Sequence, residues 1–344
     1  MSRSLKAHIL LVLVTFAWGA TFVSVKDALV VVSPLVFNAL RMATASAALV
    51  VIFWRELGQL FTRRDRQRAD AGGRDVLQTA GETPALHGRS VAVGGALLGV
   101  FLWAGYSFQT VGLRLTTPSK SAFITGLAVV LVPLIVAISG RRVPNRWTMV
   151  GVTAAFAGLY LMTIPGIPTQ AKNGLEWGTP WALGSLIKGI NVGDLITLGC
   201  PISFALHIYT MGRLMRRYPF KPIAVIQILT ATVLMAATIP LERPRLALTG
   251  EAVFAILFTG LICTAAAFSI QAWAQQFTPP THTALIFVLE PVFAALTSYV
   301  LLGEHLGARG TIGAMLILGG ILVSELKGSS VEPFHPPRAE FSIN

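Results

Sequence analysis

Apolar residues in this chain come in long runs, and short polar segments separate them. A helix rises 1.5 Å per residue, so about 20 apolar residues cross the roughly 30 Å hydrocarbon layer of a bilayer. The least regular run is the sixth, which contains Pro201 and His207. The pattern predicts an all-α polytopic membrane protein with ten transmembrane helices, near 6–26, 34–54, 91–112, 119–139, 147–164, 193–212, 222–240, 251–273, 281–302 and 309–326.

Composition supports the same class. Of the 344 residues, 54% are hydrophobic and 12% are charged, and the mean hydropathy is +0.69. A soluble domain carries about 25% charged residues and cannot keep this much apolar surface out of water. Two cysteines, Cys200 and Cys263, lie inside apolar runs, which argues against a disulfide framework and against a Cys-rich metal site. No metal and no other cofactor is expected.

The net charge of +12 does not indicate a nucleic-acid partner, because the basic residues cluster in short segments between apolar runs. An even number of spans places both termini on one side. With that side as the cytoplasm, 18 Lys and Arg residues lie on it and 8 lie on the opposite face. The bias predicts a multi-pass cell-membrane protein with both termini cytoplasmic. The N-terminal segment resembles a signal peptide, but the interpretation as a first transmembrane helix is favoured because many apolar runs follow it.

The constant spacing of similar segments indicates that the chain contains the same unit twice. Segments 17–27 and 39–46 pair with 203–213 and 225–232 at an offset of 186, whereas Gly151 and Gly158 pair with Gly313 and Gly320 at an offset of 162. An insertion of about 24 residues in the Arg-rich loop 55–90, which we expect to be a disordered cytoplasmic connector, explains the change. Five spans per unit is an odd number, so the second unit enters the membrane from the opposite side. Such inverted repeats are typical of secondary transporters.

The repeat divides the chain into four parts. A first five-helix repeat is expected over 1–165, and it contains the cytoplasmic loop 55–90. An extracytoplasmic connector follows at 166–192, and a second five-helix repeat at 193–327. The tail, 328–344, is expected to be disordered and cytoplasmic.

Three stretches resemble the EamA-type family of the drug/metabolite transporter superfamily. They are FAWGATFVSVK in the first span, FNALRMATA in the second, and ALIFVLEPVFAALTSYVLLGEHLG, followed by a Gly-rich last helix, in the ninth and tenth. The resemblance covers about 5–326 and departs in loop 55–90 and in GRRVPNR (140–146), which lacks a Gly-Glu pair. It implies ten helices, export or exchange of small metabolites, and no nucleotide hydrolysis.

Glu290 is the leading candidate for a functional side chain. A carboxylate at the centre of a membrane helix costs roughly 2.5–3.5 kcal/mol on insertion scales, so it is expected to face the bundle interior or water. Pro291 lacks an N–H, which predicts a bend or break there, at a cavity. The alternative is a structural ion pair between Glu290 and Arg41. Arg41 can instead bind a substrate carboxylate, and Gln227 occupies its position in the second unit.

Other side chains extend this candidate site. Their spacing places Trp103, Tyr106 and Gln109 roughly on one face of the third span, which suits an amphipathic ligand or lipid packing equally. His207 can shuttle protons or bond between helices. The full set of candidate substrate-binding residues is Trp18, Arg41, Trp103, Tyr106, Gln109, His207, Gln227, Gln271 and Glu290.

These observations favour a secondary transporter over an enzyme. We expect an exporter or exchanger of small organic metabolites, such as amino acids or related compounds, that alternates access around a central site. Either the solute gradient or coupled protons drive it, and the oligomeric state is open. The alternative is an intramembrane enzyme that uses Glu290, His207 and Arg41 as an acid–base group, although no nucleophile-and-base motif accompanies them.

Overall fold

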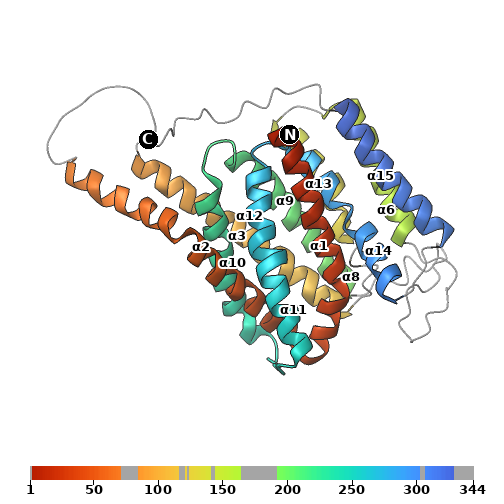
Figure 1. Ribbon diagram of the computed structural model, residues 1–344, viewed down its shortest axis with the longest axis horizontal. Coiled ribbons are helices and arrows are strands. Elements are labelled where there is room, and N and C mark those ends of the chain that lie inside the picture. Colours follow the sequence, from red (N-terminus) through yellow and green to blue (C-terminus); the bar gives the residue numbers. More distant parts are fainter. Residues whose placement is uncertain are drawn as a thin grey trace.

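A computed structural model describes residues 2–70, 84–115, 121, 124–140, 144–163, 192–302 and 307–328. In this part of the chain the structure is helical (Figure 1). The helices of the first half are α1 (Arg3–Val31), α2 (Pro34–Asp70), α3 (Pro84–Leu115), α5 (Ala128–Gly140) and α6 (Arg146–Thr163). Those of the second half are α8 (Val192–Thr197), α9 (Gly199–Leu214), α10 (Phe220–Thr238), the short η1 (Ile239–Leu241), α11 (Gly250–Gly260), η2 (Leu261–Ala266), α12 (Ala267–Ala274), α13 (Pro280–Phe287), α14 (Glu290–Leu302) and α15 (Ala308–Gly328).

Seven helices of the described part are long and apolar enough to cross a membrane, and two shorter apolar helices, Ile124–Ser139 and Ala308–Ser324, accompany them. Large apolar side chains stay exposed on the outer faces of the bundle, among them Leu13, Ile138, Val300 and Met315. Exposure of many large apolar side chains suits contact with lipid. The prediction of an all-helical, multi-span membrane protein is confirmed, while the count of ten remains a prediction.

The connector 55–90 was expected to be disordered, but part of it is helical. The helix α2 continues to Asp70 and α3 already begins at Pro84, so both ends of the segment are helical. The helix α2 has a kink at Phe53, where φ is −112° and ψ is 21°. Arg, Gln, Glu and Ala are strong helix formers, and they let the backbone stay helical beyond the apolar run. The rest of this connector, the connector at 166–192 and the tail expected after 327 lie largely outside the described residues.

Several predicted spans are interrupted helices. The sixth consists of α8 and α9, which a turn at Leu198 separates. The eighth consists of α11 and α12 joined by the π-helix η2. The ninth breaks at Val288 and Leu289, between α13 and α14. A shorter turn interrupts the fourth at Leu127, which lies 162 positions before Leu289.

Helices from the two halves pack closely through small residues. A Cβ atom added at Gly151 would lie 2.5 Å from the carbonyl oxygen of Gly320, and one added at Gly320 would lie 2.6 Å from the carbonyl oxygen of Gly151. At Gly158 the carbonyl oxygen of Gly313 blocks a Cβ in the same way. These contacts make α6 and α15 an antiparallel pair whose backbones touch, as small residues allow in membranes.

Further contacts between the halves repeat the offsets seen in the sequence. Ser46 and Thr232, 186 positions apart, share a hydrogen bond of 2.7 Å between their hydroxyls. Gly99 faces Thr230 on α10, and Gly260 faces Thr44 on α2. Thr44 and Thr230 are again 186 positions apart. The two threonines that these glycines face therefore occupy equivalent positions in the two halves, whereas the glycines themselves are 161 positions apart.

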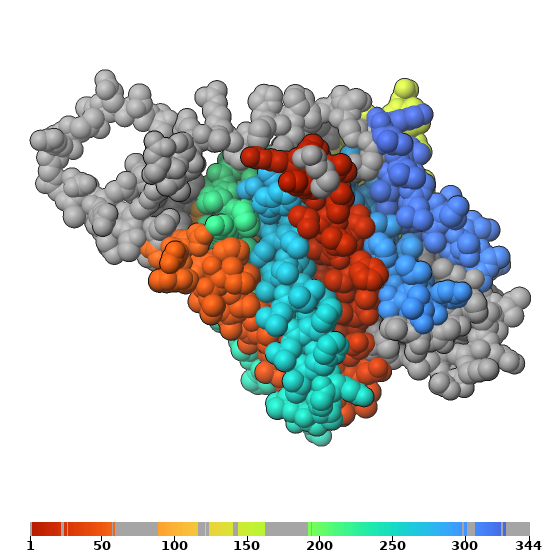
Figure 2. Space-filling view, viewed as in Figure 1, coloured from red at the N-terminus to blue at the C-terminus, as the bar shows by residue number. Residues whose placement is uncertain are grey.

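The bundle has two end faces. The upper face in Figure 1 holds the N-terminus of α1 and the end of α12, and the lower face holds the end of α1 and the start of α11. At the lower face, Glu242 accepts hydrogen bonds from the backbone N–H groups of Leu35 and Val36 and so caps α2. In the space-filling view, α1 and the α11–α12 segment lie side by side between the two faces (Figure 2).

Candidate transport cavity

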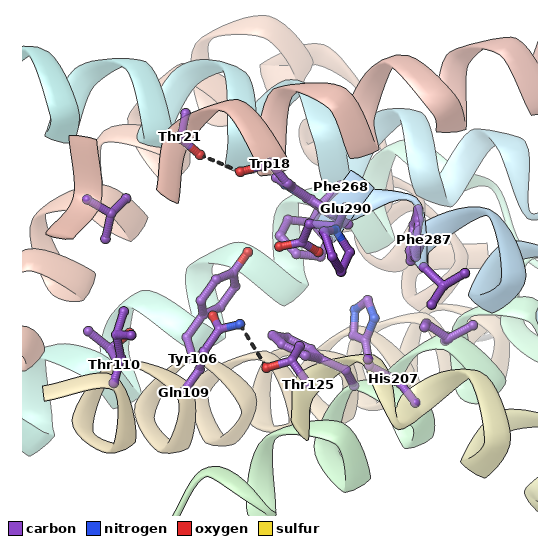
Figure 3. Close-up of a pocket in the computed structure, with 18 of the residues that line it drawn as sticks. Trp18, Thr21, Tyr106, Gln109, Thr110, Thr125, His207, Phe268, Phe287 and Glu290 are labelled. Atoms are coloured by element: carbon purple, nitrogen blue, oxygen red, sulfur yellow. Dashed lines mark hydrogen bonds between the residues drawn. The ribbon is translucent and has the colours of Figure 1, made fainter. Parts of the chain in front are cut away.

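A cavity of about 130 Å³ lies inside the bundle, where helices of both halves meet. Figure 3 shows Trp18 and Glu290 on one wall and Tyr106, Gln109 and Thr125 on the wall opposite. The lining residues are Trp18, Thr21, Val25, Phe37, Asn38, Arg41, Tyr106, Gln109, Thr110, Leu113, Thr125, Gly126, Ala128, Val129, Phe204, His207, Ile208, Phe268, Gln271, Ala284, Phe287, Val288, Glu290 and Pro291.

Most of the residues that the sequence singled out meet here. The cavity is lined by Trp18, Arg41, Tyr106, Gln109, His207, Gln271 and Glu290. Trp103 and Gln227 lie outside the lining set. The indole N–H of Trp103 donates to the Thr238 hydroxyl at 3.4 Å, and its ring packs against a cluster of buried apolar side chains. One turn of helix separates Trp103 from Tyr106, and the rotation between i and i+3 is enough to turn the two side chains to different neighbours.

Glu290 is the first residue of α14, directly after the break in the ninth span. Val288 still donates to the Ala284 carbonyl at 3.3 Å and Leu289 to the Ile286 carbonyl at 3.0 Å, so the helix tightens before it restarts. Pro291 has no N–H to continue the ladder, as its position in the sequence predicts. The break turns the Glu290 side chain into the cavity (Figure 3). A Cβ at Gly19 would lie 2.6 Å from the Glu290 carbonyl oxygen, so a glycine is needed there for α1 to pass this close.

Arg41 is held by neutral groups. Its Nε donates to the Thr264 hydroxyl at 2.7 Å, and Nη2 donates to the Tyr106 hydroxyl at 3.1 Å and to the Cys263 carbonyl at 3.3 Å. The guanidinium also lies 4.5 Å from the centroid of the Tyr106 ring. No ion pair joins Arg41 to Glu290 within the described part of the chain. The structure thus leaves the Glu290 carboxylate without this partner.

The π-helix η2 explains how Thr264 reaches Arg41. In η2 the Thr264 hydroxyl donates to the Thr259 carbonyl, five residues earlier, at 2.8 Å, and it accepts the Arg41 bond with the same oxygen. Single π-turns inside α-helices occur often at functional sites. The sequence gives no sign of this turn, because LICTAA is as apolar as its neighbours.

Aromatic rings surround the carboxylate end of the cavity. Trp18 lies 4.9 Å from Phe287 and 5.7 Å from Phe268, measured between ring centroids. The Trp18 indole N–H donates to the Cys263 carbonyl at 2.8 Å, which fixes the ring. Tyr106 meets Phe204 edge-on at 5.4 Å. An aromatic wall with few polar groups binds the apolar part of a small organic ligand well.

The remaining polar groups give the cavity its hydrogen-bonding capacity. His207 Nε2 lies 2.9 Å from the side-chain Oε1 of Gln227, so Gln227 contacts a lining residue although it does not line the cavity itself. The Gln271 Nε2 donates to Gln275, while its Oε1 is buried without a partner in the described part of the chain. No hydrogen bond joins Glu290, His207 and Arg41 to one another there. An acid–base group needs such contacts or a shared water.

Several lining residues escaped sequence reasoning. Asn38 donates to the Tyr106 carbonyl at 3.2 Å and to the Thr110 hydroxyl at 3.0 Å, and Thr125 accepts from Gln109 at 3.3 Å. The repeat offsets identify two further lining residues. Phe204 is the counterpart of Trp18 at an offset of 186, and Phe268 is the counterpart of Tyr106 at an offset of 162.

The two offsets organise the whole cavity wall. Eight pairs of lining residues are related by them, and both members of each pair face the cavity. At 186 they are Trp18 with Phe204 and Thr21 with His207; at 162 they are Tyr106 with Phe268, Gln109 with Gln271, Thr125 with Phe287, Gly126 with Val288, Ala128 with Glu290 and Val129 with Pro291. The breaks at Leu127 and Leu289 supply four of these pairs. The cavity therefore lies where equivalent parts of the halves meet.

An interior cavity between interrupted membrane helices, with a carboxylate, an arginine and an aromatic wall, is the kind of site that integral membrane transporters have. The model of the EamA-like transporter family matches residues 5–164 and 191–326. The chain belongs to this family, as the resemblance of its motifs predicted.

Individual relatives agree with the family match. An uncharacterized transporter of Archaeoglobus fulgidus is 27% identical over 325 residues, which cover 94% of this chain and 87% of the relative. A WAT1-related protein of Arabidopsis thaliana is 26% identical over 65% of this chain and 64% of its own length. A solved crystal structure with 18% identity has a TM-score of 0.66 and covers 94% of this chain and 98% of that one, which supports the fold.

Proposed function

We propose that this protein is a secondary transporter that exports or exchanges small organic metabolites, amino acids or related compounds among them, across the cell membrane. The observation that carries the proposal is the cavity between the halves, in which eight pairs of equivalent residues surround Glu290. A site at the interface of two repeats, next to broken helices, is the arrangement of many secondary transporters.

The contacts between the halves support two inverted repeats of five helices. Gly151 meets Gly320 and Gly158 meets Gly313, and the partners exchange places under the offset of 162. This exchange is what a two-fold axis between α6 and α15 produces. Inverted repeats provide two states of similar energy that open to opposite faces, and we propose alternating access on this basis.

Glu290 and Arg41 supply the charges of the proposed substrate site. With no ion pair between them, the carboxylate is free to hold an ammonium group or a coupled proton. Arg41 is fixed by Thr264 and Tyr106, so its guanidinium is positioned in advance for a substrate carboxylate. We propose contact with substrate for both residues, and for Trp18, Tyr106, Gln109, His207 and Gln271.

The test is a flux screen. Purified protein in liposomes is loaded with sets of amino acids and other small organic solutes, and efflux is followed with and without a pH gradient. We expect at least one solute to leave faster than from protein-free liposomes. Equal efflux for every solute under both conditions would contradict a transport function.

A further inference from the structure

Eight pairs of equivalent residues line the centre of the cavity, but the rest of its lining differs between the two halves. Six lining residues of the first half have counterparts, at offsets of 186 or 162, that do not line it. The six are Val25, Phe37, Asn38, Arg41, Thr110 and Leu113, and they extend the cavity towards the lower face, where α1 ends and α2 begins. We call this part the lower vestibule.

The counterparts lie on the opposite side of the central site. They are Met211, Ile223, Ala224, Gln227, Ala272 and Gln275, in the same order, and each is 0% exposed. Four of them, Met211, Ile223, Ala224 and Ala272, pack together with Val91 and Leu98 in one apolar cluster. Gln275 donates to the Ile208 carbonyl at 3.0 Å and so closes the same region.

The packed region buries a polar group, the side-chain amide of Gln227, at a cost in free energy. Gln227 Nε2 has no hydrogen-bond partner in the described part of the chain, although its residue is fully buried. An unsatisfied buried amide N–H costs about 1–3 kcal/mol. Entry of water or substrate into the region would satisfy the Gln227 amide. Its counterpart in the first half, Arg41, already lines the cavity.

We infer that Met211, Ile223, Ala224, Gln227, Ala272 and Gln275 form a second vestibule, closed in this structure, that opens to the upper face when the lower vestibule closes. The inference rests on the proposed alternating access. The inference goes beyond alternating access because it assigns the residues that line the second open state. It also predicts that Gln227 and Gln275 line an uncharged polar path in that state. Arg41 has a neutral counterpart, so a substrate carboxylate meets the arginine only from the lower vestibule.

Cysteine accessibility tests the assignment. In a background with Cys200→Ala and Cys263→Ala, Ala224→Cys and Ala272→Cys are treated with a membrane-impermeant maleimide applied at the upper face. Ala231→Cys is the matched control, because Ala231 is also 0% exposed on α10 and its counterpart, Ala45, does not line the cavity. We expect labelling at 224 and 272 to be about tenfold or more faster than at 231, since the rate follows the opening of each site. Equal rates at the three positions would overturn the inference.

A coupled variant tests the exchange of states. In Asn38→Cys with Ala224→Cys, prior attachment of a bulky maleimide at position 38 from the lower face should hold the lower vestibule open and suppress labelling at 224. Unchanged labelling at 224 would count against the inference. The unmodified protein provides a measurement free of folding defects. Amide hydrogen exchange should be faster over 224–227, beyond the first turn of α10, than over 228–238, and the reverse order would contradict the second vestibule.

The flux screen distinguishes a failure of the transporter proposal from a failure of the second vestibule. Solute flux with slow labelling at positions 224 and 272 would leave the transporter proposal standing and reject this set of residues. Absence of flux for every solute would reject the transporter proposal itself.

Discussion

The guanidinium of Arg41 lies 4.5 Å from the centroid of the Tyr106 ring and donates a hydrogen bond of 3.1 Å to the hydroxyl of the same residue. This contact joins α2 to α3 inside the membrane and takes the place of the ion pair with Glu290 that the sequence offered as an alternative. Because the guanidinium is satisfied by neutral groups, the carboxylate across the cavity stays available for a ligand.

Removing the Tyr106 hydroxyl tests this contact. Tyr106→Phe keeps the ring under the guanidinium but loses the bond to a charged group, which contributes about 1.5–3 kcal/mol. We expect a lower melting temperature of the purified protein in detergent. Arg41→Lys should lower it further, because one ammonium cannot replace bonds to Thr264, Tyr106 and the Cys263 carbonyl together. Wild-type melting in both variants would show that the contact is not stabilising.

Variants of Trp103 and Tyr106 distinguish a residue that packs outside the cavity from one that lines it. Trp103→Phe should leave the KM for a transported solute within about twofold of wild type, since Trp103 packs outside the cavity. Tyr106→Phe should change that KM, because Tyr106 lines the cavity. The measurement is the concentration dependence of flux in proteoliposomes. A larger effect at Trp103 than at Tyr106 would place the substrate elsewhere.

Two adjacent glycines of α15, Gly319 and Gly320, allow a matched pair of variants that tests the contact between α6 and α15. A Cβ at Gly320 would meet the Gly151 carbonyl oxygen at 2.6 Å, whereas a Cβ at Gly319 has no atom within 4 Å. Gly320→Ala should force α6 and α15 apart, with a cost of about 1–3 kcal/mol and a lower melting temperature. Gly319→Ala should melt like wild type, and equal behaviour of the two variants would contradict the packing.

The predicted orientation rests on the distribution of basic residues, and cysteines at Arg217 and Leu248 can test it. Arg217, between α9 and α10, belongs to the upper face, and Leu248, which is 66% exposed before α11, belongs to the lower face. In the cysteine-free background, Arg217→Cys should react with an impermeant reagent from the cytoplasm and Leu248→Cys from outside. Reaction of both from one side would contradict the assigned topology.

The sequence predicted the all-helical membrane fold and seven of the residues that line the cavity, because membrane helices leave strong patterns. A carboxylate beside a proline in an apolar run predicted both the break and the direction of Glu290. The constant offsets linked the halves and pointed to the cavity between them. Each of these depends on local residue types or on spacing along the chain.

Other features depend on rotation and neighbours, which the pattern does not contain. The side chain of Trp103 shares a helix with Tyr106 but turns towards Thr238. The partner of Arg41 is Thr264, which a π-turn in an otherwise uniform apolar segment brings into place. The helical extension of α2 to Asp70 reflects backbone propensity rather than burial, so a search for apolar runs missed it.

The most direct test of a substrate site at Glu290 combines flux with melting temperature for Glu290→Gln, Arg41→Gln and the double variant. Glu290→Gln keeps size and polarity but removes the charge, so we expect near-wild-type melting and a flux reduced about tenfold or more, with a milder loss in Glu290→Asp. Because no ion pair links the two residues, the double variant should not regain flux. Wild-type flux and melting in Glu290→Gln, or recovery of both in the double variant, would contradict the account.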